Sequence, residues 1–398
     1  MKKLACILLG CCFQISVAQI ITFTDINFKN ALLQQPIDFD LNGTPFPRLD
    51  ANNDGQISQA EALLVIKLNL SYAELNNLNG LQFFTNLKSF ESLFFRGTSF
   101  NFPTLINLEN LALSNAVSTD TNLALLNLSG NTNLKSVSCS SIASSVNLSN
   151  LDQLTNLNLT GSFTSLNLND AVDLLVLSIT APLQSLNLTN NTRLINLHLS
   201  NTSFTTLNLS TCLNIENIDI RNGMMQTLNL GNLRHVRYLF VPDNRLTSLN
   251  VNKLFNLDIL YCQNNRLTEL FLENDIIEQQ VIFSGNPNLT SICCDANEVV
   301  YMQNQCNTLG YTTNIRSCAP PTTSSSRLTM FPNPVHDKLH LTSDTSIDKI
   351  EIFSSNGLLV MTSNGVTAPL EMQSFPSGLY FVRVYRANEV SEMKFIKS

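Results

Sequence analysis

The chain has 398 residues, of which 44% are hydrophobic and 13% are charged, and its formal net charge is -7 at pH 7. This length and composition indicate two or three folded units rather than a single core or a disordered chain. Nucleic-acid binding is excluded because contacts with phosphates require clustered Lys and Arg, which the sequence lacks. With so few charges, Asn, Ser and Thr must supply most of the polar surface.

Residues 1–18 are predicted to be a signal peptide for export. Two lysines precede an apolar stretch over residues 4–15, and small residues suit cleavage before Gln19. An alternative is lipidation of Cys11, which ends a lipobox-like Leu-Leu-Gly-Cys run. No later stretch approaches the ~20 apolar residues of a membrane span. The mature chain is therefore predicted to have no transmembrane helix.

Residues 19–64 are predicted to form an N-terminal cap that begins with an amphipathic helix. In the segment ITFTDINFKNALLQ, apolar residues recur at near-helical spacing, namely at Ile26, Phe28, Leu32 and Leu33. A helix in this position, just before a long repetitive region, would seal the end of that region.

Within the cap, residues 50–61 (DANNDGQISQAE) match the twelve-residue EF-hand loop, with Gly55 at the sixth position. Oxygen donors at the ligand positions suit Ca²⁺ as a structural ion. The predicted metal ligands are Asp50, Asn52, Asp54, the Gln56 carbonyl, Ser58 through water, and Glu61. An acidic turn that binds no metal is the alternative. Residues 38–49 begin in a similar way but end in Leu49 rather than an acid, so a second metal loop stays an open question.

From residue 65 onward the sequence repeats every 20 to 22 residues. Each unit opens on an apolar residue and has further apolar residues three and five positions later; the opening residues include Leu134, Leu154, Leu174, Leu194, Ile215, Val236 and Leu257. The four or five leucines of a unit contribute about 2 kcal/mol each, whereas ordering its backbone costs about 1–2 kcal/mol per residue. No unit can fold alone, so the units must stack as coils of a solenoid.

The repeat resembles the leucine-rich repeat family, whose L-x-x-L-x-L-x-x-N pattern is matched by residues 236–244 and 257–265. The first unit, from Val65 to Leu87, is similar to the internalin type. The resemblance implies one short strand per unit lining a concave face, with Asn264, Asn265 and their counterparts binding the backbone in the turns. The register is uncertain over residues 87–133, which include an insertion at 115–122.

The second Leu-x-Leu of each unit, such as Leu207-Asn208-Leu209, predicts extended structure on the opposite side of the coils as well. Cys139 and Cys262 fall at leucine positions of the repeat and are predicted to be buried hydrophobic residues.

Four further cysteines, Cys293, Cys294, Cys306 and Cys318, crowd the end of the repeats, where export would allow one or two disulfides. With Cys212 the total in the mature chain is odd, so the sequence leaves the pairing open.

Residues 319–326 (APPTTSSS) are predicted to be a linker. Residues 327–398 resemble the type A C-terminal sorting domain of the type IX secretion system, because the runs FPNP, KLHL, KIEIF, SSNGLLV, FPSGLYFVRV and MKFIKS follow in that order. Alternating runs broken by Asn-Gly and Ser-Gly turns predict a small β-sandwich. The resemblance implies export by the type IX machinery to the outer surface of a Gram-negative bacterium or beyond it. Whether the tail is cleaved or exchanged for an anchor stays open.

The fold predicted for the whole chain is mainly β: a leucine-rich repeat domain over 65–318 with a helical, EF-hand-like cap, followed by the small sandwich. No catalytic motif such as H-E-x-x-H or G-x-S-x-G is present, and His198 has no predicted partner. The chain is therefore predicted not to be an enzyme. The alternatives are an architectural surface component without a ligand, or an enzyme whose site spans several coils. A triplet of His, acid and Ser or Cys on facing coils would indicate the latter, and none is expected.

A partner site is predicted where the concave face becomes apolar. Residues two and four positions after each opening residue should face outward, because side chains alternate along a strand. They are small and polar in the middle units, and then become large: Tyr238, Phe240, Ile259, Tyr261, Val281 and Phe283. Such a patch indicates a binding site for a protein or a glycan. The alternative is that residues 295–318 fold over the patch and cover it.

Overall fold

The computed structural model describes residues 19–34, 48–114, 123–317, 328–343, 346–355, 358–365, 369–386 and 389–398. The predicted signal peptide, nearly all of the possible second metal loop and the insertion at 115–122 lie outside these residues. The chain divides into two units, Met1–Cys318 and Ala319–Ser398, and each is described by itself.

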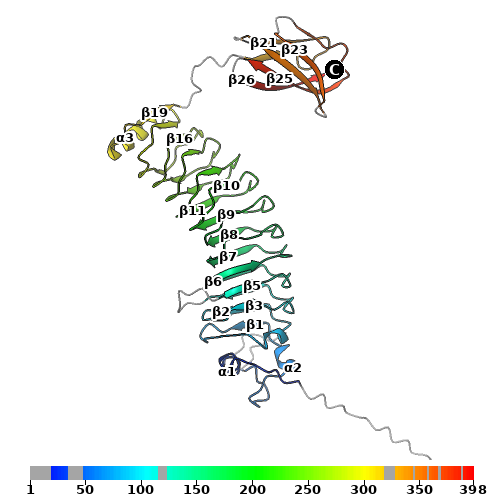
Figure 1. Cartoon of the computed structure of the whole chain (residues 1–398), viewed down its shortest axis with the longest axis vertical. Coiled ribbons are helices and arrows are strands. Elements are labelled where there is room, and N and C mark those ends of the chain that lie inside the picture. Colours follow the sequence, from blue (N-terminus) through cyan, green and yellow to red (C-terminus); the bar gives the residue numbers. More distant parts are fainter. Residues whose placement is uncertain are drawn as a thin grey trace, which may run out of the picture. The chain divides into compact units, whose positions relative to one another are not determined.

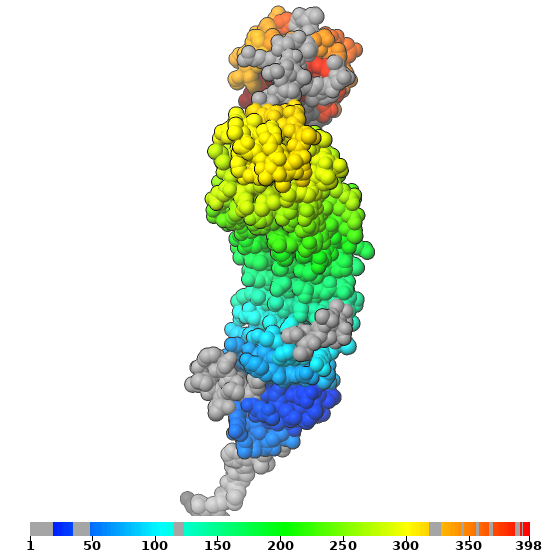
Figure 2. Space-filling view, turned by 90° about the vertical axis from the view of Figure 1, so that its left-hand side faces the viewer, coloured from blue at the N-terminus to red at the C-terminus, as the bar shows by residue number. Residues whose placement is uncertain are grey.

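The first unit is a solenoid built around one long parallel sheet, the main sheet (Figure 1). Neighbouring coils each place one strand in it, in the order β1 (Lys67–Asn69), β2 (Ser89–Ser92), β4 (Asn110–Leu113), β6 (Ser136–Asn147), β7 (Asn156–Gly161), β8 (Val176–Thr180), β9 (Asn196–Ser200), β11 (Asn217–Arg221), β13 (Tyr238–Phe240), β15 (Ile259–Tyr261) and β17 (Gln280–Ile282). The predicted stacking of repeat units is therefore confirmed. In Figure 2 the coils follow one another as a continuous column from blue to yellow.

The leucine positions of the repeat form the core of the solenoid. Every opening residue from Leu134 to Leu257 is buried, and so are the residues three and five positions later, such as Leu157 and Leu159. These side chains belong to one continuous cluster that runs from Ile21 to Cys306. Each coil is thus stabilised by apolar surface that only its neighbours can cover.

A second series of short parallel strands runs along the other side of the coils. The strands are β3 (Ser99–Asn101), β5 (Leu123–Asn127), β10 (Thr206–Asn208), β12 (Thr227–Asn229), β14 (Ser248–Asn250), β16 (Glu269–Leu272), β18 (Ser291–Cys294) and β19 (Asn314–Ser317). Of these, β3 and β5 are hydrogen-bonded to the main sheet through the second half of the long strand β6. The extended structure predicted at Leu207 is therefore confirmed. Residues 162–170 and 183–189 form no strand, so the series is interrupted in the middle coils.

Buried asparagines fix the turns after the later main-sheet strands. The side-chain amide of Asn265 donates to the carbonyl of Val241 at 2.9 Å, and its Oδ1 atom accepts from the Leu246 N–H at 2.9 Å. Asn244 and Asn286 bind equivalent backbone groups in the adjacent coils. Because an unpaired buried backbone group is costly, these amides hold successive coils in one register.

The turn asparagine Asn264 behaves differently from the prediction. Its side chain is exposed and donates to Asp243 Oδ1 at 2.8 Å rather than to the backbone. Its φ of 57° is left-handed, a conformation that Asn tolerates better than most residues. Of these two asparagines, only Asn265 therefore binds the backbone through its side chain.

The N-terminal end of the solenoid carries two helices, α1 (Ile26–Gln34) and α2 (Gln59–Ala62), and a short 3-10 turn, η1 (Leu81–Phe83). Phe28 and Leu32 of α1 are buried in the solenoid core, whereas Ile26 is exposed, contrary to the predicted apolar stripe. Asp25 precedes the helix and accepts from the Asn76 N–H in the first coil at 2.6 Å. This carboxylate ties α1 to the repeats.

The C-terminal end of the solenoid is closed by α3 (Val299–Leu309) and β19. Met302 and Cys306 of the helix are buried in the solenoid core. Gly310, with φ of 71°, ends the helix in a left-handed conformation. The chain then returns to pair β19 with β18.

The second unit consists of two antiparallel sheets. One contains β20 (Thr329–Phe331), β21 (Lys338–Thr342) and β24 (Leu370–Glu371), and the other contains β23 (Leu359–Asn364), β22 (Lys349–Ser354), β25 (Gly378–Arg386) and β26 (Glu389–Lys397). Residues of both sheets, such as Leu339 and Val382, share one buried core. This core is separate from that of the solenoid.

Candidate functional site

The outer face of the main sheet is formed by alternate residues of its strands. In β13, for example, Leu239 is buried in the core while Tyr238 and Phe240 on either side are half-buried. The outward residues of β7, β9 and β11 are mostly small and polar. From β13 onward most of them are large, and together they form the apolar patch: Tyr238, Phe240, Ile259, Tyr261 and Ile282.

The prediction that Val281 and Phe283 belong to this patch is wrong by one residue. Both side chains are buried in the core, with 4% and 1% of their surface exposed. The register of β15 and β17 brings Gln280 and Ile282 outward instead. The slip arises because Glu278 occupies the position where the other coils have their opening apolar residue, so the apolar pattern misplaces this strand.

The aromatic rings of the patch contact one another. The ring centroids of Phe240 and Tyr261 are 4.9 Å apart, and those of Tyr238 and Phe240 are 6.3 Å apart in a stacked arrangement. Tyr261 donates its hydroxyl to Gln280 Oε1 at 2.7 Å. The guanidinium of Arg237 lies 5.5 Å from the centroid of Tyr238. These contacts hold the rings in place, and each ring keeps part of its surface open to solvent.

The C-terminal segment does not cover the apolar patch within the described residues. Helix α3 buries Met302 and Cys306 at the end of the core, and β19 extends the strands on the side away from the main sheet. Phe240 and Tyr261 remain half-exposed. The segment therefore closes the last coil, and the patch stays open.

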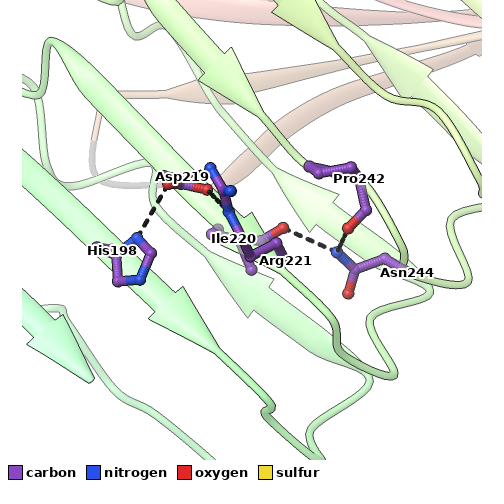
Figure 3. A network of polar contacts seen from close by, with 6 residues as sticks. All are labelled: His198, Asp219, Ile220, Arg221, Pro242 and Asn244. Carbon is purple, nitrogen blue, oxygen red and sulfur yellow. Dashed lines mark hydrogen bonds and ion pairs between the residues drawn. The ribbon is translucent and has the colours of Figure 1, made fainter. Parts of the chain in front are cut away.

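A polar cluster of His198, Asp219 and Arg221 is shown in Figure 3. It lies next to the patch, because Asp219 on β11 is paired with Phe240 on β13. His198 Nδ1 is 3.0 Å from Asp219 Oδ2, and Arg221 donates to the same carboxylate through Nε at 2.7 Å and Nη2 at 2.6 Å. The bonds to Asp219 raise the pKa of Arg221 above its ordinary value. The sequence reasoning missed this partner of His198. The signal was present, because both residues stand four positions after the opening residue of adjacent coils.

The polar cluster and the patch meet at a shallow hollow of about 280 Å³. Its polar lining comes from Ser178, Asn196, His198, Asn217 and Asp219, and Phe240 borders it on the patch side. The Asn217 amide donates to Asn196 Oδ1, so the two side chains are ordered relative to each other. The exposed lining of the hollow is mainly apolar and includes Val176 and Phe240, and the polar groups add a few fixed hydrogen-bonding atoms.

The sequence was expected to place no triplet of His, acid and Ser or Cys on facing coils, but the strand register brings one together. Ser178, His198 and Asp219 occupy equivalent positions on β8, β9 and β11. The arrangement lacks the features of a nucleophilic site, however. Arg221 neutralises the Asp219 carboxylate. Among the described contacts, no hydrogen bond joins Ser178 to His198. The nearby strand amides form hydrogen bonds within the parallel sheet and do not form an oxyanion hole.

The predicted metal loop at 50–61 is tightly turned by its own side chains. Asp50 accepts from the Gly55 N–H at 2.8 Å and from the Asp54 N–H at 3.1 Å, and Asp54 accepts from the Gln56 N–H at 2.7 Å. Gly55 has φ of 73°, the left-handed conformation that the sixth position of such a loop uses.

The loop ends at the buried carboxylate of Glu61. Its Oε1 atom accepts from the Ala51 N–H at 3.0 Å, and Oε2 accepts from the N–H and hydroxyl of Ser58 at 2.8 and 2.9 Å. The Ile21 N–H donates to the Ile57 carbonyl at 2.8 Å, so the loop is joined to the strand-like segment before α1. Glu61 therefore holds both ends of the loop together.

The donor set of the loop suits calcium, but its carboxylates are turned toward backbone N–H groups. The Asn52 amide donates to Asp54 Oδ2 at 2.9 Å. Across the described residues, no three His, Cys, Asp or Glu side chains come together in a way that holds a metal ion. Calcium binding would require the carboxylates of Asp50, Asp54 and Glu61 to rotate toward a common centre.

The cysteines of the described chain are mostly free thiols. Cys293 is in a disulfide, whereas Cys139, Cys212, Cys262, Cys294 and Cys306 are free and buried. Burial raises the pKa of Cys139 and of Cys262 to about 12, so both thiols stay protonated and serve as core residues, as their leucine positions predict.

Two buried glutamates meet under the C-terminal helix. Glu278 and Glu298 are 4% and 2% exposed, and the Asn274 amide donates to Glu278 Oε1 at 2.7 Å. No other donor reaches the Oε2 atom of either carboxyl among the described groups. Burial, followed by the bond and charge of Glu278, raises the pKa of Glu298 to about 8. The Glu298 carboxyl is therefore mostly protonated at neutral pH.

Residues 329–398 match a protein family described as the secretion system C-terminal sorting domain. No curated protein sequence matches the chain. Among the described residues, no helix is long and apolar enough to span a membrane.

Several solved structures are similar to the chain. The functional domain of InlJ from Listeria monocytogenes is 17% identical, with a TM-score of 0.49 and coverage of 70% of this chain and 68% of that chain. The internalin InlF of the same species is 18% identical, with a TM-score of 0.34 and coverage of 76% and 94%. The ectodomain of the Arabidopsis thaliana receptor kinase GASSHO1/SCHENGEN3, solved with CASPARIAN STRIP INTEGRITY FACTOR 2, is 19% identical, with a TM-score of 0.39 and coverage of 54% and 31%.

The stacked coils of about 20 residues, their parallel main sheet and the asparagines in their turns are the features of a leucine-rich repeat solenoid. The tail matches a sorting domain over its last 70 residues. The chain is a leucine-rich repeat protein that carries the C-terminal sorting domain of the type IX secretion system.

Proposed function

We propose that the chain is an exported, non-catalytic binding protein whose main sheet recognises a protein or glycan at or beyond the cell surface. The observation that carries this proposal is the apolar patch. Five large side chains gather on three adjacent strands of a sheet whose other outward residues are mostly small and polar. Exposed apolar patches with aromatic anchors are characteristic of binding surfaces.

The same face supports binding rather than catalysis. A Ser–His–Asp mechanism needs an acidic residue that stabilises a charged imidazole and donors that stabilise an oxyanion. Here the Asp219 carboxylate is paired with Arg221, and the strand amides are used within the sheet. Ser178, His198 and Asp219 are therefore assigned to ligand contact. An architectural role without a ligand would give no reason for exposed rings on one short part of the sheet.

Replacing both Phe240 and Tyr261 by Ala is expected to weaken partner binding by at least about tenfold, because the loss of even one aromatic anchor commonly costs about 1.4 kcal/mol or more. Both rings are half-buried, so the loss of stability should stay below the 3–5 kcal/mol typical of a fully buried ring. Binding to arrayed glycans and extracellular proteins, together with the melting temperature, measures the two effects. Tyr72→Ala is the matched control, since Tyr72 is 88% exposed in the first coil. A collapse of stability with unchanged affinity would contradict the proposal.

We also propose that residues 50–61 bind Ca²⁺ as a structural ion. The support is the full set of oxygen donors at the expected spacing and the left-handed turn at Gly55. The ion would be held by Asp50, Asn52, Asp54 and Glu61, with the Gln56 carbonyl and Ser58 completing the shell. Because these groups lie between α1 and the first coil, a bound ion would strengthen the N-terminal end of the solenoid.

Adding calcium in place of a chelator is expected to raise the melting temperature, because a ligand that binds only the folded chain stabilises it by mass action. Asp50→Asn should abolish the rise, since it removes one carboxylate charge while keeping the amide as an acceptor for the Gly55 N–H. Asp152→Asn, in an exposed turn of the solenoid, serves as the control. Equal melting curves with calcium and with chelator would leave the acidic-turn alternative.

A further inference from the structure

We propose that the occupant of the main sheet is an uncharged polysaccharide chain, which lies across the strands from the hollow at β8 to the apolar patch at β17. This inference rests on the proposed binding function and names the chemistry of its ligand. Three observations support it: the near absence of ionic groups on the face, the preordered amides in the hollow, and the rings beside them.

The face is almost uncharged over a long distance. Between β4 and β17, the outward residues within the strands include only two ionic side chains, Asp219 and Arg221, and these two neutralise each other. Arg237, which precedes β13 and packs on Tyr238, is paired with Asp258 in the same way. Protein partners are commonly recognised through complementary charge, which supplies specificity and speeds association. A face with no net charge instead matches a ligand that carries none, and it disfavours acidic polysaccharides as well as charged protein surfaces.

The polar groups of the face suit hydroxyl groups. An amide side chain both donates and accepts hydrogen bonds, as a sugar hydroxyl does. In the bond from Asn217 to Asn196, Asn217 donates one Nδ2 hydrogen to Asn196 Oδ1. Among the described contacts, the Nδ2 group of Asn196 and the Oδ1 atom of Asn217 remain available. His198 likewise uses only Nδ1 on Asp219. Because these groups are already fixed, ligand binding costs little further ordering.

The aromatic rings of the patch can bind the apolar face of a sugar ring. The C–H groups of a pyranose ring form an apolar face, which packs on an aromatic ring in the way that other apolar surfaces do. Phe240 borders both the hollow and the patch, and Tyr261 contacts it at 4.9 Å. Adjacent strands are spaced by about 4.8 Å, which is comparable with the length of a sugar residue in an extended chain. Successive strands can therefore meet successive sugars.

The form of the hollow is compatible with a polymer. It is open to solvent rather than enclosed, and its volume of about 280 Å³ is close to the lower end of the range of about 300–1,000 Å³ that small-molecule sites occupy. Such a shallow site encloses part of a ligand and leaves the rest to lie along the sheet. The patch on β13, β15 and β17 provides the continuing surface.

Affinity electrophoresis of the full chain in gels that contain mannan, xyloglucan, mixed-linkage β-glucan or dextran tests the proposal. Heparin and alginate serve as charged polysaccharides. At least one neutral polysaccharide should retard the chain, and raising NaCl from about 50 to 500 mM should leave its Kd within about twofold, because no charge pair is involved. Asn217→Leu and, separately, Tyr261→Ala should weaken binding about tenfold while the melting temperature shows that each variant is folded.

Two results would overturn the inference. They differ in whether the proposed binding function of the main sheet is also contradicted. If no neutral polysaccharide binds while an extracellular protein binds in a manner that depends on Phe240 and Tyr261, the ligand class is wrong and the proposed function survives. If a polysaccharide binds equally well to the patch variants and to the wild-type chain, the site is elsewhere and both proposals fail.

Discussion

Removal of residues 327–398 is expected to abolish export almost completely and to leave the truncated chain inside the cell envelope. The tail matches a sorting domain over residues 329–398, and it forms a unit with its own buried core. The solenoid should therefore still fold when the tail is removed, while the signal read by the secretion machinery is lost. Cell fractionation and protease treatment of intact cells measure the amounts inside and outside.

The matched control transfers residues 319–398, together with the predicted signal peptide over residues 1–18, to an unrelated periplasmic reporter, which should then appear outside the cell. A second control is a point variant of the solenoid such as Tyr72→Ala, which should be exported normally. Truncated chain at the surface in wild-type amounts would show that the tail is not the sorting signal.

Raising the pH from about 5 to 8 is expected to weaken the solenoid through the Glu278–Glu298 pair. The pKa of Glu298 is about 8 in the folded chain, against 4.5 for an ordinary glutamate. Within this window the folded chain holds a proton that the unfolded chain lacks, so the free energy of unfolding falls as the pH rises, by on the order of 1 kcal/mol per pH unit. Below pH 4.5 and above pH 8 the pair does not change how the free energy of unfolding depends on pH.

Urea unfolding at pH 5, 6, 7 and 8 measures this effect. Glu298→Gln should flatten the dependence because it removes the titrating group. Glu278→Leu should reduce it only in part, because Glu298 stays buried, and should also stabilise the chain by restoring the apolar residue of the repeat. Glu269→Gln, at an exposed position of strand β16, is the control and should keep the wild-type slope. Equal slopes in all four proteins would show that Glu298 does not titrate between pH 5 and 8.

Much of the solenoid was predictable because a single physical pattern repeats. Each buried position recurs every 20 to 22 residues, so errors at one coil are corrected by its neighbours, and the opening residues from Leu134 to Leu257 are all buried. The strand at β17 was misplaced because Glu278 interrupts that pattern. A shift of one residue turns every side chain of a strand to the other face, which is why Val281 and Phe283 were assigned to the patch.

The polar features were less predictable because they depend on contacts between coils. His198 and Asp219 were both expected on the face, yet their contact follows only from the alignment of β9 with β11. The pairing of Glu278 with Glu298 depends on where α3 folds against the last coil, which no repeat position specifies. Asn264 and Asn265 are adjacent and chemically identical, and only the left-handed turn at Asn264 separates their roles.

Hydroxyl-radical footprinting of the full chain, with and without the polysaccharide that retards it most strongly, tests the binding site most directly. Tyr238, Phe240 and Tyr261 are half-exposed and reactive side chains, and each should be modified several-fold more slowly in the complex. Tyr72, which is 88% exposed in the first coil, should react at an unchanged rate and serves as the internal reference. Protection of Tyr72 or of the reverse side of the coils, with the three patch residues unchanged, would contradict the assignment of the main sheet as the binding face.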